Sequence, residues 1–296
     1  MPIELTWKHN DRLSAIHLAY CSTCFSEKAY FRLPECRIQA SLLGGAVKSL
    51  VVPASRAWEL LFQLGPDSGT NDDLANRLCV RCLRVEERTE PVIGRLRSAL
   101  REAELAMANE YPDFAEETKL RQRPLQEQWE AFGPGLLHQI GKLMNNSLLV
   151  EKAEICLVPP VSGGFGWAHL QTNRCHVEAV LINQDRELAE VIRLAWLLSQ
   201  LDFERPQFSD KINSFRLRRV AGLAMLPAVL AAAEILGLAV LNTESILRGL
   251  VLWRMESPGS KALALAEVLM AWWETVCTAQ ANWTVALTGL DRLAAD

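Results

Sequence analysis

Residues 151–201 constrain the fold more than any other part of the chain. They read as an apolar strand at 154–158, a glycine-rich loop, an alternating β-hairpin and an amphipathic helix at 186–201. At least three more helical segments follow, at 220–241, 245–254 and 261–277, and we expect a last one at 283–293. We therefore predict an α+β fold, predominantly helical, in which a short antiparallel sheet with a β-hairpin packs against a helical bundle.

The hairpin at 167–181 separates polar from apolar side chains. A two-residue turn at 172–173 (Thr-Asn) fits because asparagine tolerates positive φ. That turn pairs His169 directly with His176 and places Glu178 diagonally on the same polar face, which we expect to be exposed. These three side chains could bind a metal ion, and the histidines could act as an acid–base pair. The alternative is an ordinary solvated strand face.

The layout of strand, hairpin and helix over 151–201 resembles the core of zinc-dependent peptidases of the zincin type. The resemblance is one of topology. The helix contains no H-E-x-x-H motif, because Glu190 has no histidine one residue before it or three residues after it. The resemblance therefore implies a shared layout without the metal-binding helix, and we transfer no site residue from that family.

Two Cys-x-x-Cys pairs form a second candidate site. Cys21 and Cys24, and then Cys79 and Cys82, have the ligand spacing of a four-cysteine zinc site. The apolar residues around Cys79 also suggest a helix, on which cysteines three residues apart simply share a face. Two interpretations stay open: a zinc-stabilised binding module, or cysteines packed in a core.

A histidine lies near the first of these cysteines. His17 is four residues before Cys21, so on a helix the two side chains would share a face. In that position His17 could activate the thiol as a nucleophile.

The domain organisation follows from shifts in sequence pattern. We predict a mixed α/β lobe at 1–85, a helical brace at 86–147, and a lobe at 148–296 that contains the hairpin and a helical bundle; one compact domain is the alternative. In the first lobe we expect short strands at 29–33 and 49–52, with a turn-rich joint at 41–47. In the brace we expect a break or kink at Pro124 and a helix end at 133–135.

Charge and hydropathy restrict the partners. The net charge is −4, which gives no overall attraction to nucleic acid or to an anionic membrane. The segment 220–241 is long and apolar enough for a membrane span, but it contains Pro227 and Glu234, so we predict a buried helix there. Glu234 lies either at an exposed edge or beside Arg218 or Arg219. The N-terminus has no apolar signal segment, so we expect a cytoplasmic protein with reduced cysteines.

The function prediction rests on what these patterns lack. No nucleophile, base and orienting group can be assembled with suitable spacing, so we predict no catalytic residues and no cofactor. The leading hypothesis is an intracellular, non-enzymatic interaction or scaffold protein with a protein partner. The alternatives are a metal-dependent hydrolase-like protein centred on the hairpin and a zinc-stabilised binding module using the cysteine pairs. Trp272 and Trp273 point about 100° apart on a helix, so we expect one of them to contact a partner or another lobe.

Overall fold

The computed structural model describes residues 3–25, 35–144 and 148–294, and it confirms a mostly helical α+β fold. The strands are β1 (Glu4–His9), β2 (Lys152–Val158), β3 (Gly166–His169) and β4 (Arg174–Glu178). The α-helices are α1 (Asp11–Cys24), α2 (Arg37–Lys48), α3 (Ala54–Leu64), α4 (Asn71–Cys82), α5 (Glu90–Glu110), α6 (Phe114–Leu143), α7 (Glu190–Leu198), α8 (Pro206–Ser209), α9 (Ser214–Ile235), α10 (Thr243–Leu252), α11 (Ser260–Ala279) and α12 (Trp283–Leu293).

The chain forms two compact units. Unit 1 comprises Met1–Trp7, Arg121–Ile155 and Gly164–Asp296, and unit 2 comprises Lys8–Leu120 and Cys156–Gly163. The division falls within β1, β2 and α6. The three lobes expected from the sequence stay a prediction.

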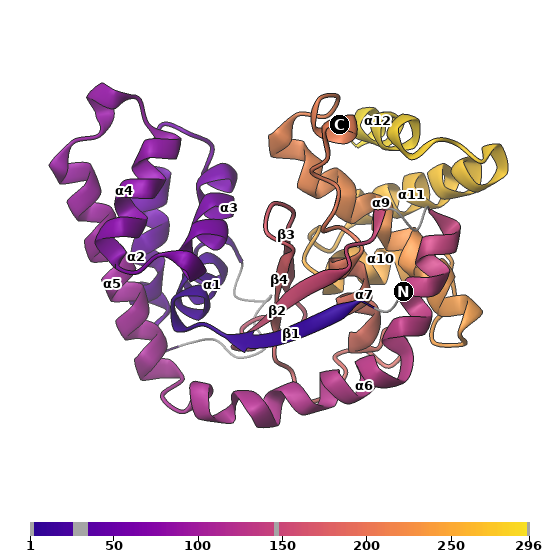
Figure 1. Ribbon diagram of the computed structural model, residues 1–296, viewed down its shortest axis with the longest axis horizontal. Helices are drawn as coiled ribbons and strands as arrows, with labels where there is room; N and C mark the ends of the chain where they lie inside the picture. Colours follow the sequence, from indigo (N-terminus) through magenta and orange to yellow (C-terminus); the bar gives the residue numbers. More distant parts are fainter. Residues whose placement is uncertain (1–2, 26–34, 145–147, 295–296) are drawn as a thin grey trace. The chain divides into compact units, whose positions relative to one another are not determined.

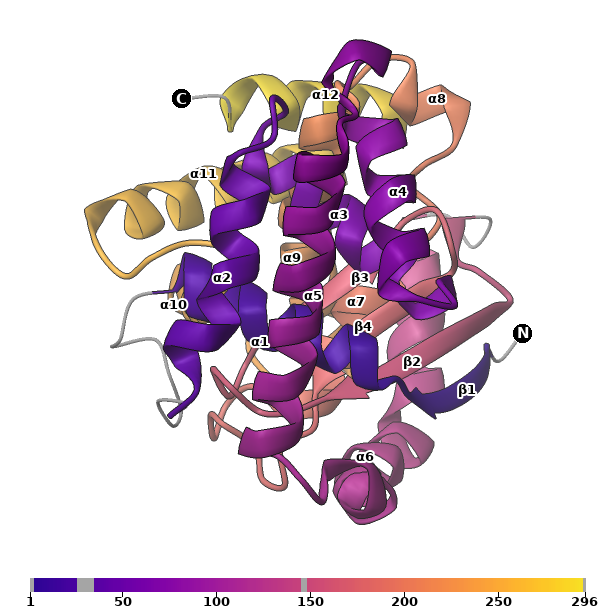
Figure 2. The ribbon, with the colours of Figure 1, turned by 90° about the vertical axis from the view of Figure 1, so that its left-hand side faces the viewer.

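Unit 2 is a helical bundle in which α1 and α4 begin at side-chain caps. The Asn10 side chain accepts a hydrogen bond from the backbone N–H of Leu13 at 2.8 Å, and Thr70 caps α4 by accepting from Asp73 N–H at 3.0 Å. Helix α5 packs against α1, α2 and α4. It lies between α2 and α4 in Figure 2. Its buried stripe contains Leu96, Leu100, Ala103 and Met107.

The strand predicted at 49–52 is wrong, because these residues form a turn and bend after α2. The turn-rich joint predicted at 41–47 lies inside α2. Gly44 explains this difference. A Cβ at Gly44 would lie 2.1 Å from the side-chain oxygen of Thr23. The glycine therefore allows α2 to approach α1 closely and does not mark a turn. The strand predicted at 29–33 lies outside the described residues.

Helix α6 continues through both prolines, so the break predicted at Pro124 and the helix end predicted at 133–135 are wrong. Each proline removes one backbone hydrogen bond, but packing on one face holds the helix across both positions. That face consists of buried side chains spaced four, seven and four residues apart: Leu125, Trp129, Leu136 and Ile140.

The chain has a small mixed sheet with the strand order β1-β2-β4-β3, and its antiparallel β3–β4 hairpin belongs to unit 1. Helix α7 packs on the hairpin and on α9. Helix α9 also contacts α10, α11 and α12 (Figure 1). All nine residues of α7 are buried, so the amphipathic helix predicted at 186–201 is a shorter, fully buried helix.

The first part of the apolar segment at 220–241 is the buried part of α9, whereas 236–241 lie beyond the end of the helix. Every residue from Val220 to Ala233 is buried. The helix ends at Ile235, and Glu234 lies exposed, where its carboxylate accepts the N–H of Leu241 at 3.0 Å. Of the two positions expected for Glu234, the exposed edge is therefore the observed one.

Among the described residues, α11 alone is long and apolar enough to cross a membrane, judged by length and composition. This is weak evidence for a span, because core helices pass the same test. The solvent-facing side of α11 carries Glu267 and Glu274. Trp272 and Trp273 are both buried, and the Trp272 indole N–H donates to the Ala286 carbonyl at 3.1 Å. A contact of one of them with a partner or another lobe stays a prediction.

Candidate functional site

The β3–β4 hairpin has a different register from the one predicted. His169 pairs with Arg174, and His176 pairs with Trp167. The loop at 170–173 has four residues, closed by a hydrogen bond from Thr172 N–H to the His169 carbonyl at 3.1 Å. Asn173 has a φ of 47°, in keeping with its expected tolerance of positive φ. The observed register differs from the predicted one by two residues. Because a shift of two residues preserves the alternation, the strand side chains lie on their predicted faces, although the predicted pairing is wrong.

The two histidines nevertheless meet, as diagonal neighbours. His169 Nε2 lies 3.0 Å from His176 Nδ1, and both side chains are buried, so the expected solvent exposure is wrong. Burial is the main reason that the pKa of His169 falls to about 3, and the positive charges of Arg174 and Arg218 lower it further. His169 is therefore neutral at physiological pH.

Two arginine side chains lie near this pair of histidines. Arg174 Nε donates to the Glu154 carboxylate at 2.6 Å, and the guanidinium of Arg218 lies 3.6 Å from the ring centroid of Trp167. Neutral imidazoles are good metal ligands, but two nearby guanidinium groups raise the cost of placing a divalent cation there.

Glu178 makes other contacts within unit 1. Its carboxylate accepts the N–H of Phe165 at 3.3 Å. A metal site formed by His169, His176 and Glu178 stays a prediction.

Helix α7 binds the hairpin through a buried arginine. Arg193 donates to the carbonyl oxygens of Phe165 at 2.8 Å and of Glu178 at 3.1 Å. It also forms an ion pair with Glu190, and burial raises the pKa of that carboxyl group. The zincin-like layout of hairpin and helix is thus present, but Arg193 binds backbone carbonyls of the hairpin. The sequence signal that we missed is a lone arginine in the middle of an apolar helix.

The four cysteines of the predicted zinc site all lie in unit 2. Cys21 and Cys24 occupy the last turn of α1, and Cys79 and Cys82 the last turn of α4. A zinc site formed by these four thiols stays a prediction. Burial raises the pKa of Cys79, and raises that of Cys82 to about 11.

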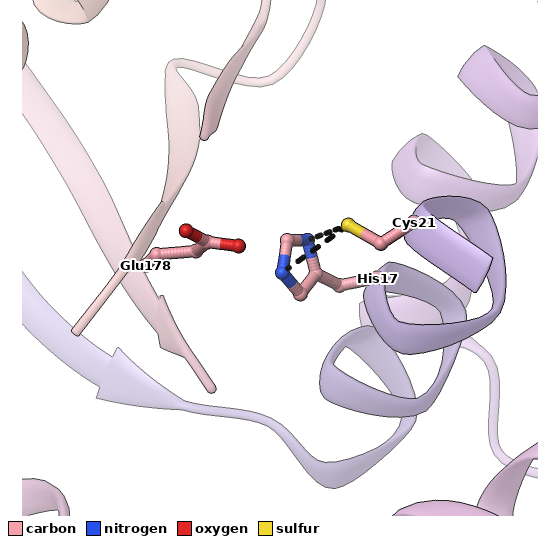
Figure 3. Close-up of side chains that lie close together, drawn as sticks. All are labelled: His17, Cys21 and Glu178. Atoms are coloured by element: carbon pink, nitrogen blue, oxygen red, sulfur yellow. Dashed lines mark hydrogen bonds between the residues drawn. The ribbon is translucent and has the colours of Figure 1, made fainter. Parts of the chain in front are cut away.

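The predicted proximity of His17 and Cys21 is confirmed. Both side chains are buried on α1, and the sulfur lies 3.7 Å from Nε2 and 3.9 Å from Nδ1 of the imidazole. Figure 3 shows the ring of His17 next to the Cys21 sulfur; it also labels Glu178, which belongs to β4 of unit 1. A catalytic role for the thiol stays a prediction.

No protein-family model matches the chain, and neither a curated protein nor a solved structure matches it significantly.

Proposed function

We propose that the protein is a non-enzymatic interaction protein that binds a protein partner through the outer face of α2 in unit 2. The observation that carries this proposal is an apolar stripe on that face. Ile38 is 78% exposed and Leu42 is 51% exposed. Gly45 follows at the same helical spacing, and a Cβ placed there would have no atom within 4 Å. We call these three residues the α2 stripe.

The α2 stripe lies opposite the side of α2 that packs in the bundle. The buried residues of α2 include Ala40, Leu43 and Val47, whereas positions 38, 42 and 45 point the other way. Val51, just after the helix, adds another apolar side chain that is 72% exposed. Burying an exposed leucine or isoleucine side chain contributes about 1.5–3 kcal/mol. A partner that covers this stripe therefore gains binding free energy from side chains that the bundle leaves exposed.

The hairpin of unit 1 supports the non-enzymatic part of the proposal. Its groups with catalytic chemistry make contacts within the fold: His169 with His176, Arg174 with Glu154, and Arg193 with two carbonyls. A general base needs to lie within hydrogen-bonding reach of a substrate atom. These contacts are those of a buried network that holds hairpin and helix together.

Quantitative affinity capture with the full chain tests the proposal. The variants are Leu42→Glu and, as a matched control, Val80→Glu on α4, a position that is 57% exposed. Both variants add one negative charge to an exposed helical site. We expect wild type and Val80→Glu to retain the same partner from a lysate of the source cells and Leu42→Glu to lose it. Retention by Leu42→Glu, or turnover of a substrate by the purified chain, would contradict the proposal.

A further inference from the structure

Helix α1 of unit 2 is buried over most of its surface and nevertheless carries a row of polar side chains. Ser14, His17 and Cys21 follow one another at spacings of three and four residues, so their side chains share one face of the helix. All three are fully buried. We call these three residues the α1 stripe. Packing alone does not require polar groups at such positions, and each of them needs a polar partner.

His17 and Cys21 have the separation of two ligands that share one metal ion. The sulfur of Cys21 lies 3.7 Å from Nε2 of His17, and the two side chains approach each other from neighbouring turns of α1 (Figure 3). A tetrahedral zinc ion, with Zn–S of about 2.3 Å and Zn–N of about 2.0–2.1 Å, holds its sulfur and nitrogen ligands about 3.6 Å apart. Two ligands four residues apart on one helix are also the arrangement in which the histidines of an H-E-x-x-H helix bind zinc.

The hydroxyl of Ser14 is an independent indication of a bound group. Ser14 lies one turn before His17 on the same face, and its side chain is fully buried. Within the described part of the chain, its Oγ atom has no hydrogen-bond partner. A buried hydroxyl without a partner is unfavourable, and water on a bound ion is one of the partners that satisfies such a group.

The position along α1 also favours a cation. His17 and Cys21 lie in the second half of the helix, toward the end where the backbone carbonyl groups give a partial negative charge. The last turn of α1 contains no basic residue that would compensate this charge. A cation bound by these two side chains therefore lies near the negative end of the helix dipole.

We infer that unit 2 binds a divalent cation of the Zn²⁺ class through the imidazole of His17 and the thiolate of Cys21. Imidazole nitrogen and thiolate sulfur are ligands that zinc prefers, and the thiol proton passes to solvent when the ion binds. The two side chains supply two of the four ligand positions, and the Ser14 hydroxyl lies on the face where it can bind water held by the ion. This inference goes beyond the interaction surface on α2 and does not depend on it.

Cobalt substitution in the full chain tests the inference. Because the pair is buried, the ion is supplied during folding, by producing the protein in medium that contains Co²⁺ in place of zinc. The purified protein is then examined for bound cobalt and for the sulfur-to-cobalt charge-transfer absorption of a thiolate ligand. We expect about one cobalt ion per chain and this absorption band in wild type.

Two pairs of matched variants locate the site. Cys21→Ala is compared with Cys24→Ala, which removes an exposed thiol from the same helix, and His17→Gln is compared with His138→Gln at an exposed position. Cys21→Ala and His17→Gln should lower the cobalt content at least about tenfold, because loss of a direct ligand costs no less than loss of an outer hydrogen-bond partner. Cys24→Ala and His138→Gln should match wild type.

Four results would overturn the inference. They are the absence of cobalt from wild type, a charge-transfer band that survives Cys21→Ala, a cobalt content unchanged in His17→Gln, and loss of cobalt in Cys24→Ala, which would indicate the four-cysteine site instead. X-ray absorption of the zinc-loaded wild type keeps the inference testable if either stripe variant fails to fold. We expect one sulfur and at least one imidazole nitrogen around the zinc, and several sulfur ligands or none would contradict the assignment.

Discussion

In the hairpin of unit 1, imidazole and charged side chains are buried, whereas in α2 of unit 2 isoleucine and leucine face solvent. The hairpin groups contact one another and the backbone, as with the His169–His176 pair and the two carbonyls bound by Arg193. The side chains of the α2 stripe are not covered by such contacts, since Ile38 is 78% exposed. The difference teaches that reactive residue types can be structural, while apolar residues can mark the functional surface.

The largest expected effect comes from removing the arginine that joins α7 to the hairpin. Arg193→Ala removes one donor from each of two buried carbonyls and the counter-charge of the buried Glu190 carboxylate, so we expect a loss of about 3–5 kcal/mol in the free energy of unfolding. Denaturant titration monitored in unit 1 measures this. Arg123→Ala is the matched control, because its ion pair with Glu127 at 2.7 Å is fully exposed and screened by solvent. Equal effects of the two variants would contradict a structural role for the buried network.

The next effect is on the pH dependence of stability. The pKa of His169 lies at about 3 in the folded chain against an ordinary value of 6.5, so the unfolded chain binds the extra proton first. The stabilisation from burying neutral His169 is fully present above about pH 6.5. As the pH falls from there toward 3, the free energy of unfolding decreases by up to about 1.4 kcal/mol per pH unit. His169→Gln should flatten this slope, whereas His138→Gln, at an exposed position, should leave it unchanged. Unfolding titrations at several pH values compare the slopes, and an unaltered slope in His169→Gln would count against the burial argument.

Neighbouring leucines on α2 sharpen the contrast within one helix. Leu43 is fully buried and Leu42 is half exposed. Leu43→Ala should cost about 2–5 kcal/mol of unfolding free energy, while Leu42→Ala should change it by less than about 0.5 kcal/mol. Thermal or denaturant unfolding of unit 2 checks both values. A large cost for Leu42→Ala would mean that this side chain packs within the bundle.

The smallest expected effect concerns the zinc content of the purified protein. Because His169 and His176 contact each other near two guanidinium groups, we expect the hairpin to hold no stoichiometric zinc in protein purified from zinc-containing medium. Elemental analysis measures this. About one zinc per chain, lost in Cys79→Ser but kept in His169→Ala, would favour the four-cysteine module. The reverse pattern would favour the hairpin site.

The sequence predicted the fold class and the faces of the hairpin but not its exact pairing. Alternation of polar and apolar residues determines the face, whereas a slide of two residues preserves that alternation and changes the partner of His169. The sequence also could not show that the polar face of the hairpin is buried, since burial depends on packing between segments that are distant along the chain. In α2, the paired glycines suggested a turn, although Gly44 serves close packing of two helices. The α2 stripe was missed because exposure of Ile38 becomes visible only once the buried side of α2 is known.

Site-specific photocrosslinking from α2 in the source cells tests the central claim most directly. A photoreactive residue replaces Leu42 in one full-length chain and Val80 in another. We expect one discrete protein adduct from position 42 and none from position 80. Absence of an adduct at position 42, or the same adduct from both positions, would contradict the account.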